Sequence, residues 1–326
     1  MAAAVTERVW RASSPATIER DLSDLWRDLA AKGPIARAIM ANLVIVRAAR
    51  LERRAGVAID AVASQHPSRV IIIDHDSSGG PCEIRNTRVG VVTFAASGTS
   101  RYGIEQIAVR STCTDESLPS LIRRLARGAL PISVWWAEDL SQVPPRASIV
   151  ETGRQLVYDS RQWSDVRKGV IALEPWGHLD LADVNWRRLA AVRRAVILAA
   201  AVDNGQWHPA GMRITHRAAD RALAWLLAGW LASRLNWPGG ALPAMEELPP
   251  EGDTVVALSV GRGADAISVR SDGRHVVVEH YSRPRSVIGI PHEDDADAIA
   301  AELHSLFHDA RLHDALSALR RYFSAK

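Results

Sequence analysis

The sequence predicts an α/β N-terminal domain, with a mixed sheet containing a βαβ unit and a hairpin, followed by an α+β C-terminal domain. Three observations favour this fold class. The chain has 326 residues, too many for one small hydrophobic core, which favours one large domain or two ordinary ones. The composition, 47% hydrophobic and 24% charged, is typical of globular proteins. Strand and helix patterns alternate in the first half, whereas the second half has a helical pair, a β-meander and terminal helices. We therefore predict domains at residues 1–163 and 164–326.

The first half begins with a predicted βαβ unit. A β-branched run from Asn42 to Arg47 is followed by helical spacing as far as Gln65 and by a second apolar run from Arg69 to Asp74. A helix between two such strands indicates parallel neighbours in one sheet. Alternating residues 83–96 and 103–113 then predict an antiparallel hairpin that turns near Ser97 and Gly98.

The rest of the first half adds one helix and two strands. An amphipathic helix is expected to start near Asp115 or Ser117, and strands are expected over residues 131–136 and 154–160, the latter the last of the sheet. The chain from Ser164 to Val184 contains Gly169, Pro175 and Gly177, so we expect irregular structure there and place the domain boundary at its start.

The second half opens with two predicted helices. The first has Asn185 as its expected N-cap and stops at Asn204 and Gly205, and the second, residues 215–237, places apolar residues at a 3.6-residue period. After a loop, strands are predicted over residues 254–260, 264–270 and 274–281, with 286–290 as a candidate fourth. Two amphipathic helices, 295–310 and 312–323, end the chain.

Composition and missing motifs exclude several functional classes. The net charge is only +3, and the arginines are mixed with acids, so no basic stripe predicts nucleic-acid binding. No apolar run is long enough for a membrane span, and the charged N-terminus does not resemble a signal peptide, so we expect a cytoplasmic protein. No phosphate-binding glycine loop or nucleophile elbow is present, and we expect no cofactor, metal or catalytic residue.

The strongest enzyme-like feature is the segment from Asp74 to Gly80. Asp74, His75 and Asp76 follow a predicted parallel strand, where open α/β sheets bind ligands, and a Ser-Gly-rich loop comes next. These residues are the alternative ligand site: the two acids and the imidazole could hold a metal or share a proton, and the loop could approach a phosphate. The simpler interpretation, which we favour, is that they solvate a strand end and begin a turn.

Histidines and cysteines give weaker signals. His304 and His308 are four residues apart on a predicted helix, with His313 beyond, but no carboxylate lies between them, so we expect surface histidines. Cys82 and Cys113 flank the predicted hairpin, and we favour a structural thiol pair over a redox switch.

Tryptophan provides the recognition hypothesis. There are eleven tryptophans, against four tyrosines and three phenylalanines. Trp135 and Trp136 end one predicted strand and must face opposite sides of it, so we expect Trp135 in the core and Trp136 toward a partner. Asn185, Trp186, Arg187 and Arg188 begin a helix. Because Trp and Arg are enriched at interface hot spots, we predict that these six residues bind a partner, with core packing as the alternative for each tryptophan.

Four segments carry a family resemblance: "PISVWWAEDL", "RQLVYDS", "DLADVNWRRLAAVRRAVI" and "LLAGWLASRLNW", in this order. The chain from about Asn42 to Trp237 resembles the glucose-6-phosphate dehydrogenase assembly protein (OpcA) family. The resemblance implies a bacterial cytoplasmic protein without catalysis of its own. Its implied partner is glucose-6-phosphate dehydrogenase, which it activates or assembles at the start of the oxidative pentose phosphate pathway.

The sequence departs from the family pattern at three places. Vicinal cysteines of some members are replaced by residues Tyr102 to Ile104, the usual aromatic after "RRLAA" is Val192, and an acidic segment is replaced by "AAAVDNG". These departures leave open a divergent paralogue with another partner. The alternative function is an enzyme or sugar-phosphate-binding protein with its site at Asp74 to Gly80.

Overall fold

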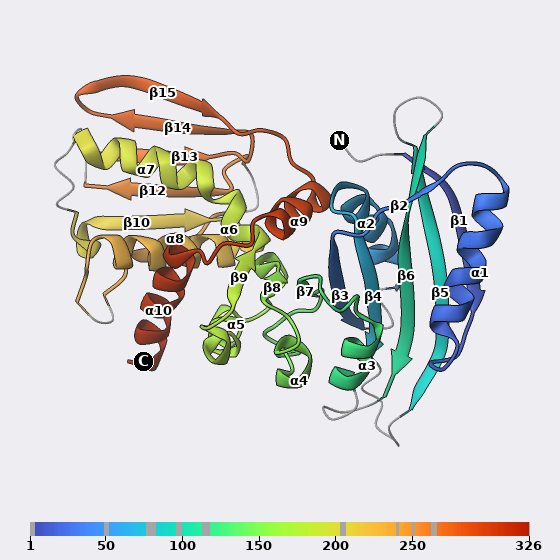
Figure 1. Cartoon of the computed structure of the whole chain (residues 1–326). Coiled ribbons are helices and arrows are strands. Elements are labelled where there is room, and N and C mark those ends of the chain that lie inside the picture. Colours follow the sequence, from blue (N-terminus) through green and yellow to red (C-terminus); the bar gives the residue numbers. More distant parts are fainter. Residues whose placement is uncertain are drawn as a thin grey trace. The chain divides into compact units, whose positions relative to one another are not determined.

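The computed structural model describes residues 4–48, 52–75, 83–95, 100–112, 118–202, 207–238, 241–249, 252–261 and 266–325. The chain forms two compact units (Figure 1), each assembled from separate stretches of sequence. Unit 1 comprises Met1–Glu138, Pro145–Tyr158 and Asp294–Phe307. Unit 2 comprises Asp139–Pro144, Asp159–Glu293 and His308–Lys326.

Unit 1 is built on a mixed sheet in which β5, β6, β4, β3, β7 and β8 follow one another, with β1 beside β5 and β2 paired to β6. The strands are β1 (Val5–Ala12), β2 (Ala36–Arg37), β3 (Ala41–Ala48), β4 (Ser68–His75), β5 (Ile84–Ala95), β6 (Arg101–Ser111), β7 (Ile132–Trp136) and β8 (Gln155–Tyr158). Strands β6, β4, β3, β7 and β8 are parallel, whereas β5 is antiparallel to both β6 and β1. The predicted βαβ unit and the antiparallel pairing of the hairpin strands are confirmed, whereas the predicted turn at Ser97 and Gly98 lies outside the described residues.

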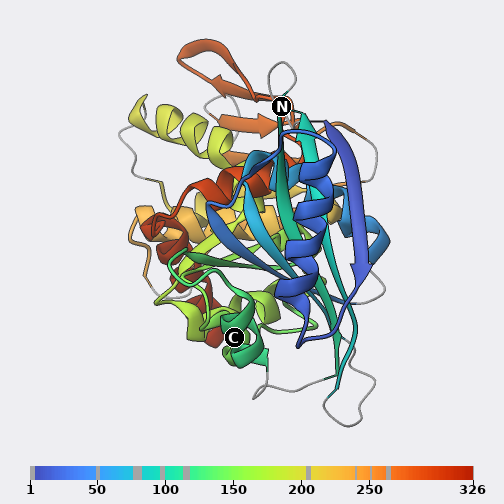
Figure 2. The same cartoon turned by 45° about the vertical axis from the view of Figure 1, so that its right-hand side comes forward.

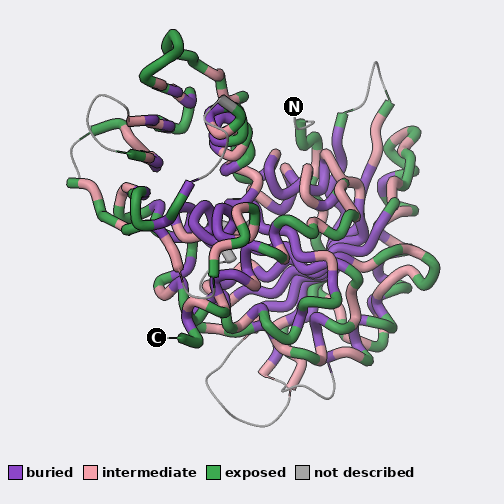
Figure 3. Tube along the Cα trace, turned by 90° about the vertical axis from the view of Figure 1, so that its left-hand side faces the viewer, coloured by how far each residue is buried: buried purple, intermediate pink, exposed green. Residues whose placement is uncertain are grey.

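The helices of unit 1 cover this sheet. They are α1 (Ile18–Ala31), α2 (Glu52–Gln65), α3 (Leu118–Leu125), α4 (Ala147–Val150) and α9 (Asp295–His304). Helix α1 packs against β5 (Figure 2) through the stripe of Ile18, Leu22, Leu25 and Leu29, which recur at helical spacing and are buried. Residues of β3 and β4 are almost all buried, as expected for parallel strands covered on both faces (Figure 3). Neither β1 nor α1 was predicted from the sequence.

Unit 2 contains a six-stranded sheet in the order β11-β10-β12-β13-β14-β15. The strands are β10 (Met212–His216), β11 (Ala244–Glu247), β12 (Val256–Val260), β13 (Ile267–Ser271), β14 (His275–His280) and β15 (Arg283–Gly289). Strands β12 to β15 form the predicted meander, including the candidate fourth strand. Strands β10 and β11 were missed, because β10 was assigned in part to a helix and β11 to a loop.

The helices of unit 2 are α5 (Val166–Ala172), α6 (Val184–Arg188), α7 (Ala190–Val202), α8 (Arg221–Arg234) and α10 (Ala310–Ser324). Helix α7 packs against β13 and β14, and α8 packs against α10. Helix α5 and the short strand β9 (Asp180–Asp183) lie between Ser164 and Val184. The prediction of irregular structure in this segment is therefore wrong. A cap at Asp165 explains α5, since its side chain accepts a hydrogen bond from the Lys168 amide.

The N-cap of α6 also differs from the prediction. Asp183, and not Asn185, caps the helix, and its Oδ1 accepts a hydrogen bond of 2.9 Å from the Asn185 amide. Both residue types are good caps, and the local sequence offered no way to choose between Asp183 and Asn185. The predicted single helix is divided at Leu189 into α6 and α7.

Helix α9 belongs to unit 1 although it lies near the end of the chain. It packs against α2, where Gln65 Nε2 donates a 2.8 Å hydrogen bond to Asp297 Oδ1. At its other end, buried Gln155 donates to the Glu302 carbonyl at 2.8 Å and to the Ser305 carbonyl at 3.1 Å. These bonds satisfy carbonyls that a helix C-terminus leaves without intrahelical partners.

Candidate functional site

The predicted site at Asp74 lies in unit 1 at the end of β4. Asp74 is buried, and its Oδ1 accepts a 2.7 Å hydrogen bond from Arg47 Nε of the neighbouring strand β3. A carboxylate held in a buried ion pair favours a structural role over proton transfer. His75 is half-buried at the last position of β4, and Asp76 to Gly80 lie outside the described residues.

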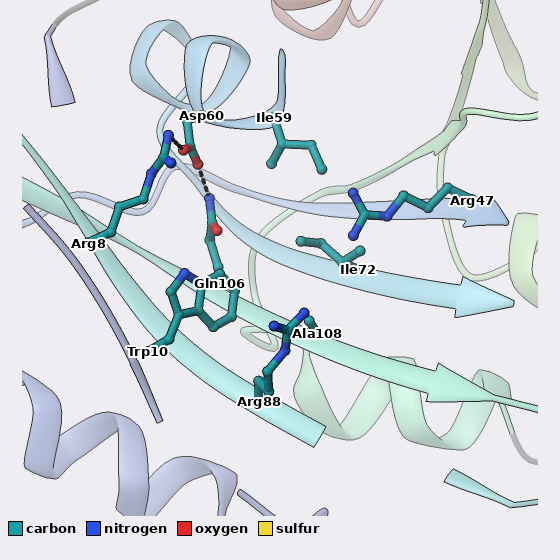
Figure 4. Close-up of a pocket in the computed structure, with 9 residues that line it drawn as sticks. All are labelled: Arg8, Trp10, Arg47, Ile59, Asp60, Ile72, Arg88, Gln106 and Ala108. Atoms are coloured by element: carbon teal, nitrogen blue, oxygen red, sulfur yellow. Dashed lines mark hydrogen bonds and ion pairs between the residues drawn. The ribbon is translucent and has the colours of Figure 1, made fainter. Parts of the chain in front are cut away.

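Arg47 also lines a cavity of about 170 Å³ on the face of the same sheet (Figure 4). Arg8 forms an ion pair with Asp60, and Gln106 Nε2 donates a 2.6 Å hydrogen bond to the same carboxyl group. Burial raises the pKa of Asp60, against the opposing effects of Gln106 and Arg8. The guanidinium of Arg88 lies 5.5 Å from the ring centre of Trp10. The lining residues therefore place three arginines beside one carboxylate: Arg8, Trp10, Arg47, Ile59, Asp60, Ile72, Arg88, Gln106 and Ala108.

The tryptophan pair lies on β7 of unit 1. Trp135 is 7% exposed and Trp136 is 1% exposed, so the structure does not present Trp136 on the surface as expected. The reason is the position of β7, which runs parallel between β3 and β8 inside the sheet. A parallel strand in that position is covered on both faces, so both indoles are buried.

Asp183 and Asn185 form a buried polar cluster at the start of α6 in unit 2. Asp183 Oδ1 accepts hydrogen bonds from the amides of Ser160, at 3.1 Å, and Asn185. Asn185 Nδ2 donates a 3.0 Å hydrogen bond to Ser160 Oγ. Burial and the nearby charge of Asp159 raise the pKa of Asp183 to about 7, although the amide donors oppose this shift. Asn185 thus organises the turn before α6 and is itself buried.

Trp186 connects three helices of unit 2. Its ring is 4% exposed, and its Nε1 donates a 2.8 Å hydrogen bond to Asp309 Oδ2. Asp309 is the N-cap of α10, so this bond ties α6 to the start of α10. The Arg193 guanidinium of α7 lies 3.7 Å from the centre of the ring, in cation–π geometry. Trp186 therefore positions the surrounding arginines.

Arg187 and Arg188 are the two predicted partner residues that are most accessible. Arg187 Nε lies 2.8 Å from Glu293 Oε2, and Arg188 lies 3.2 Å from Asp159 Oδ1. Both side chains are partly exposed, so these ion pairs lie at the surface, where their free energies are small. Carboxylates of a partner can replace Glu293 and Asp159 at these guanidinium groups with little loss of free energy.

A second cavity of unit 2, of about 340 Å³, lies beside Trp186 and was not predicted from the sequence. We name it the arginine pocket. It is lined from α7, α8 and α10 by Ala190, Arg193, Arg194, Ile197, Leu198, Trp230, Arg234 and Arg311. No lining residue is acidic. The lining residues come from three helices between positions 190 and 311, and only the fold brings these helices together. The pair Arg193–Arg194 on a predicted helix was the single local signal.

The histidines do not form one site. Helix α9 ends at His304, so His304 and His308 do not share a helix face, and the prediction that they do is wrong. His304 packs against His66 in unit 1 with ring centres 4.7 Å apart, whereas His308 stacks on His313 in unit 2 at 4.0 Å. Among the residues that the structure describes, no group of three or more His, Cys, Asp or Glu side chains could hold a metal ion. Cys82 and Cys113 lie outside the described residues.

Two family models match the chain. Residues 59–174 match the model described as the N-terminal domain of a glucose-6-phosphate dehydrogenase subunit. Residues 179–316 match the model described as the C-terminal domain of the same subunit.

Curated relatives carry a related description. A "Putative OxPP cycle protein OpcA" from Synechococcus elongatus is 25% identical over 194 residues, which cover 56% of this chain and 43% of the relative. A protein with the same description from Nostoc punctiforme is 29% identical over 133 residues, covering 37% of this chain and 28% of the relative. The matches thus span less than half the length of these relatives.

Among solved structures, a super-repressor mutant of Gal80p from Saccharomyces cerevisiae is similar with a TM-score of 0.44 and 9% identity, covering 87% of this chain and 95% of that one. The UDP-N-acetylglucosamine 3-dehydrogenase GnnA from Acidithiobacillus ferrooxidans has a TM-score of 0.41 and 10% identity, and the match covers 88% of this chain and 95% of that one. Similarities at this level say nothing about the function of this chain. In the described parts of the chain, every helix is too short or too polar to cross a membrane.

Proposed function

The chain belongs to the glucose-6-phosphate dehydrogenase assembly protein (OpcA) family, and from this premise we propose that it is a non-catalytic factor that binds glucose-6-phosphate dehydrogenase in the cytoplasm and favours its active oligomer. The observation that carries the proposal is the pair of domain matches over residues 59–174 and 179–316. The action belongs to the oxidative pentose phosphate pathway, which the "OxPP" of the relatives' description supports.

The mechanism that follows is thermodynamic linkage. A protein that binds the active form of an enzyme more tightly than the inactive form shifts the equilibrium by its difference in affinity. A shift of about 2.7 kcal/mol requires free activator at roughly a hundred times its dissociation constant. Such an activator needs a recognition surface and no reacting residue.

The Trp186–Arg188 segment is our proposed contact region. Arg187 and Arg188 are accessible, and Trp186 and Asn185 hold the backbone from which they project. The buried Trp135 and Trp136 do not offer exposed rings, and we assign them a supporting role in unit 1.

The test is to titrate the chain into glucose-6-phosphate dehydrogenase from the same organism while measuring the initial rate and the oligomer mass together. We expect the rate to rise and the mass distribution to move toward the larger species over the same concentration range. Binding without a change in either quantity would reduce the role to that of a scaffold, and absence of binding would reject the proposal.

The cavity of Figure 4 supports a second candidate function, the binding of a sugar phosphate. Arg8, Arg47 and Arg88 line the cavity, where Arg8 pairs with Asp60 and Arg47 pairs with Asp74. Guanidinium groups match the oxyanion geometry of phosphate, and the Trp10 ring offers an apolar face to a sugar.

Calorimetry distinguishes this second function. Glucose 6-phosphate and inorganic phosphate are titrated separately into the wild-type chain and into the Arg88→Gln variant. We expect binding of glucose 6-phosphate that weakens in the variant. Equal binding of both anions would assign a simple phosphate site, and no heat from either anion would reject sugar-phosphate binding.

A further inference from the structure

Helix α7 of unit 2 is apolar on two opposite faces. Its inner stripe, Val192, Ala195, Val196 and Ala199, is buried where α7 packs against β13 and β14 (Figure 1). Its outer stripe is Ala190, Arg194, Ile197, Leu198 and Ala201, which recur at the same helical spacing and are all exposed. A surface helix normally has a polar outer face, and a helix that is apolar on both faces is normally covered.

The exposure at the outer stripe is large for aliphatic side chains. Ile197 is 56% exposed and Leu198 is 55% exposed, and they are adjacent in sequence and line the same pocket. Single exposed apolar residues are ordinary, but a contiguous group rimmed by polar residues marks an interaction site.

Arginines surround this apolar stripe. Arg194, Arg234 and Arg311 line the arginine pocket beside Ile197 and Leu198, and each is exposed. None of the three side chains forms an ion pair with another residue in the described part of the chain. Several other arginines of unit 2 behave differently: Arg187, Arg188, Arg213, Arg217 and Arg221 all have carboxylate partners. The charge on this face is therefore not compensated by the lining of the pocket.

We propose that the outer stripe of α7 and the arginine pocket dock an acidic amphipathic segment of the partner, which by the function proposed above is glucose-6-phosphate dehydrogenase. Apolar side chains of that segment cover Ile197 and Leu198, and its carboxylates pair with Arg194, Arg234 and Arg311. The cation–π contact between Arg193, which lines the pocket, and Trp186 links the pocket to the α6 segment that carries Arg187 and Arg188. Charge complementarity fixes the chemistry of the occupant.

Charge also argues against a second copy of this chain on the same face. A twofold contact places the same patch of both copies together, so the arginines of one copy would meet those of the other. Like charges in contact oppose association, whereas an acidic segment removes the repulsion among the arginines themselves.

Two double variants test the proposal. Ile197→Asp with Leu198→Asp removes the apolar contact and adds negative charge, and Arg194→Glu with Arg311→Glu reverses the charge at the rim. The matched controls on β15 are Val287→Asp, which changes a comparably exposed apolar residue, and Arg283→Glu, which reverses an exposed arginine. Affinity for the purified dehydrogenase is measured at about 50 mM and about 300 mM NaCl, and thermal melting checks that each variant is folded.

We expect both double variants to weaken binding roughly tenfold or more, as truncation of interface hot spots does, and both controls to bind as the wild type does. Salt should weaken wild-type binding more than binding of the arginine variant, because exposed charge pairs are screened.

The outcomes separate the two proposals. If the wild-type chain does not bind the dehydrogenase at all, the proposed function fails and the arginine pocket needs another partner. If the wild type binds and both double variants bind equally well, the function stands and this docking surface is rejected. If the wild-type chain is a dimer by sedimentation and the Ile197→Asp, Leu198→Asp variant is a monomer, a second copy covers α7 and the proposal is also rejected.

Discussion

Asp183 at the N-terminus of α6 links the stability of unit 2 to pH. Its pKa is raised from the ordinary value of about 3.8 to about 7, mainly by burial and then by the charge of Asp159. Between about pH 4 and about pH 7 the folded chain binds a proton at Asp183 that the unfolded chain does not. The free energy of unfolding therefore falls as pH rises through this window, on the order of 1 kcal/mol per pH unit from this residue.

We expect Asp183→Asn to remove this dependence. An asparagine side chain still offers an oxygen to the Ser160 and Asn185 amides, so the cap is kept. Urea unfolding of wild type and variant at pH 5 and pH 8 measures the effect, and the variant should gain stability relative to the wild type at pH 8. Equal differences at the two pH values would show that Asp183 has an ordinary pKa.

At the residue scale, the sequence predicted the enrichment of Trp and Arg near positions 186 to 188 but not which side chains are buried. Strand periodicity requires Trp135 and Trp136 to face opposite sides, and this is compatible with one exposed ring. Whether a ring on β7 is exposed depends on its neighbours in the sheet, β3 and β8, and β3 comes from a distant part of the chain. Similarly, Arg194, Arg234 and Arg311 come from three helices, and no local pattern could show that they line one pocket.

Gly229 shows how closely helices α8 and α10 of unit 2 approach. A Cβ atom at this position would lie 2.6 Å from the Ala315 carbonyl oxygen and 2.7 Å from Leu319 Cγ. Alanine at a helix interior gains about 1 kcal/mol of helix propensity over glycine. The overlap includes backbone and a buried leucine, so forcing the helices apart costs more, typically 1–3 kcal/mol for overpacking.

We therefore expect Gly229→Ala to destabilise the chain by about 1–2 kcal/mol, measured as a lower midpoint of urea unfolding. Gly211→Ala is the matched control, because a Cβ at Gly211 meets no other atom within 4 Å. An unchanged or higher midpoint for Gly229→Ala would mean that α10 can move away without loss of packing.

At the element scale, long periodic segments were predicted correctly and their ends were not. The predicted second helix included Thr215 and His216, which instead pair with β11 and β12 as the end of β10. Pairing with strands that lie further along the chain overrode the local pattern there. Strand β1 was missed for the same reason, because its pairing with β5 joins residues about eighty positions apart.

The two interleaved units lead to a prediction about fragments. Residues 1–163 lack α9, whose Ile299 and Leu303 are buried in unit 1. Burial of each such side chain contributes about 1.5–3 kcal/mol. We expect a fragment of residues 1–163 to unfold at lower urea than the same fragment with residues 294–307 attached through a flexible linker. A scrambled 294–307 segment is the control, and equal midpoints for all three proteins would show that α9 does not stabilise unit 1.

At the scale of the whole molecule, the sequence predicted two parts of different architecture, and two sheets are found. It proposed one boundary, at 163/164, and the fragments above test whether that boundary yields independent domains. Local composition changes can mark a linker, but they carry no information on which earlier element a late helix will join. Helix α9 has an ordinary amphipathic sequence that would suit either unit.

The assignment of α9 to unit 1 has a consequence for biosynthesis. Because unit 1 includes Asp294–Phe307, its native packing cannot be completed until the ribosome has synthesised residue 307. At roughly 5–20 residues per second, the interval between residues 158 and 307 lasts on the order of ten seconds. During that time the surfaces of α2 and β8 that α9 later covers are open to chaperones and to other nascent chains.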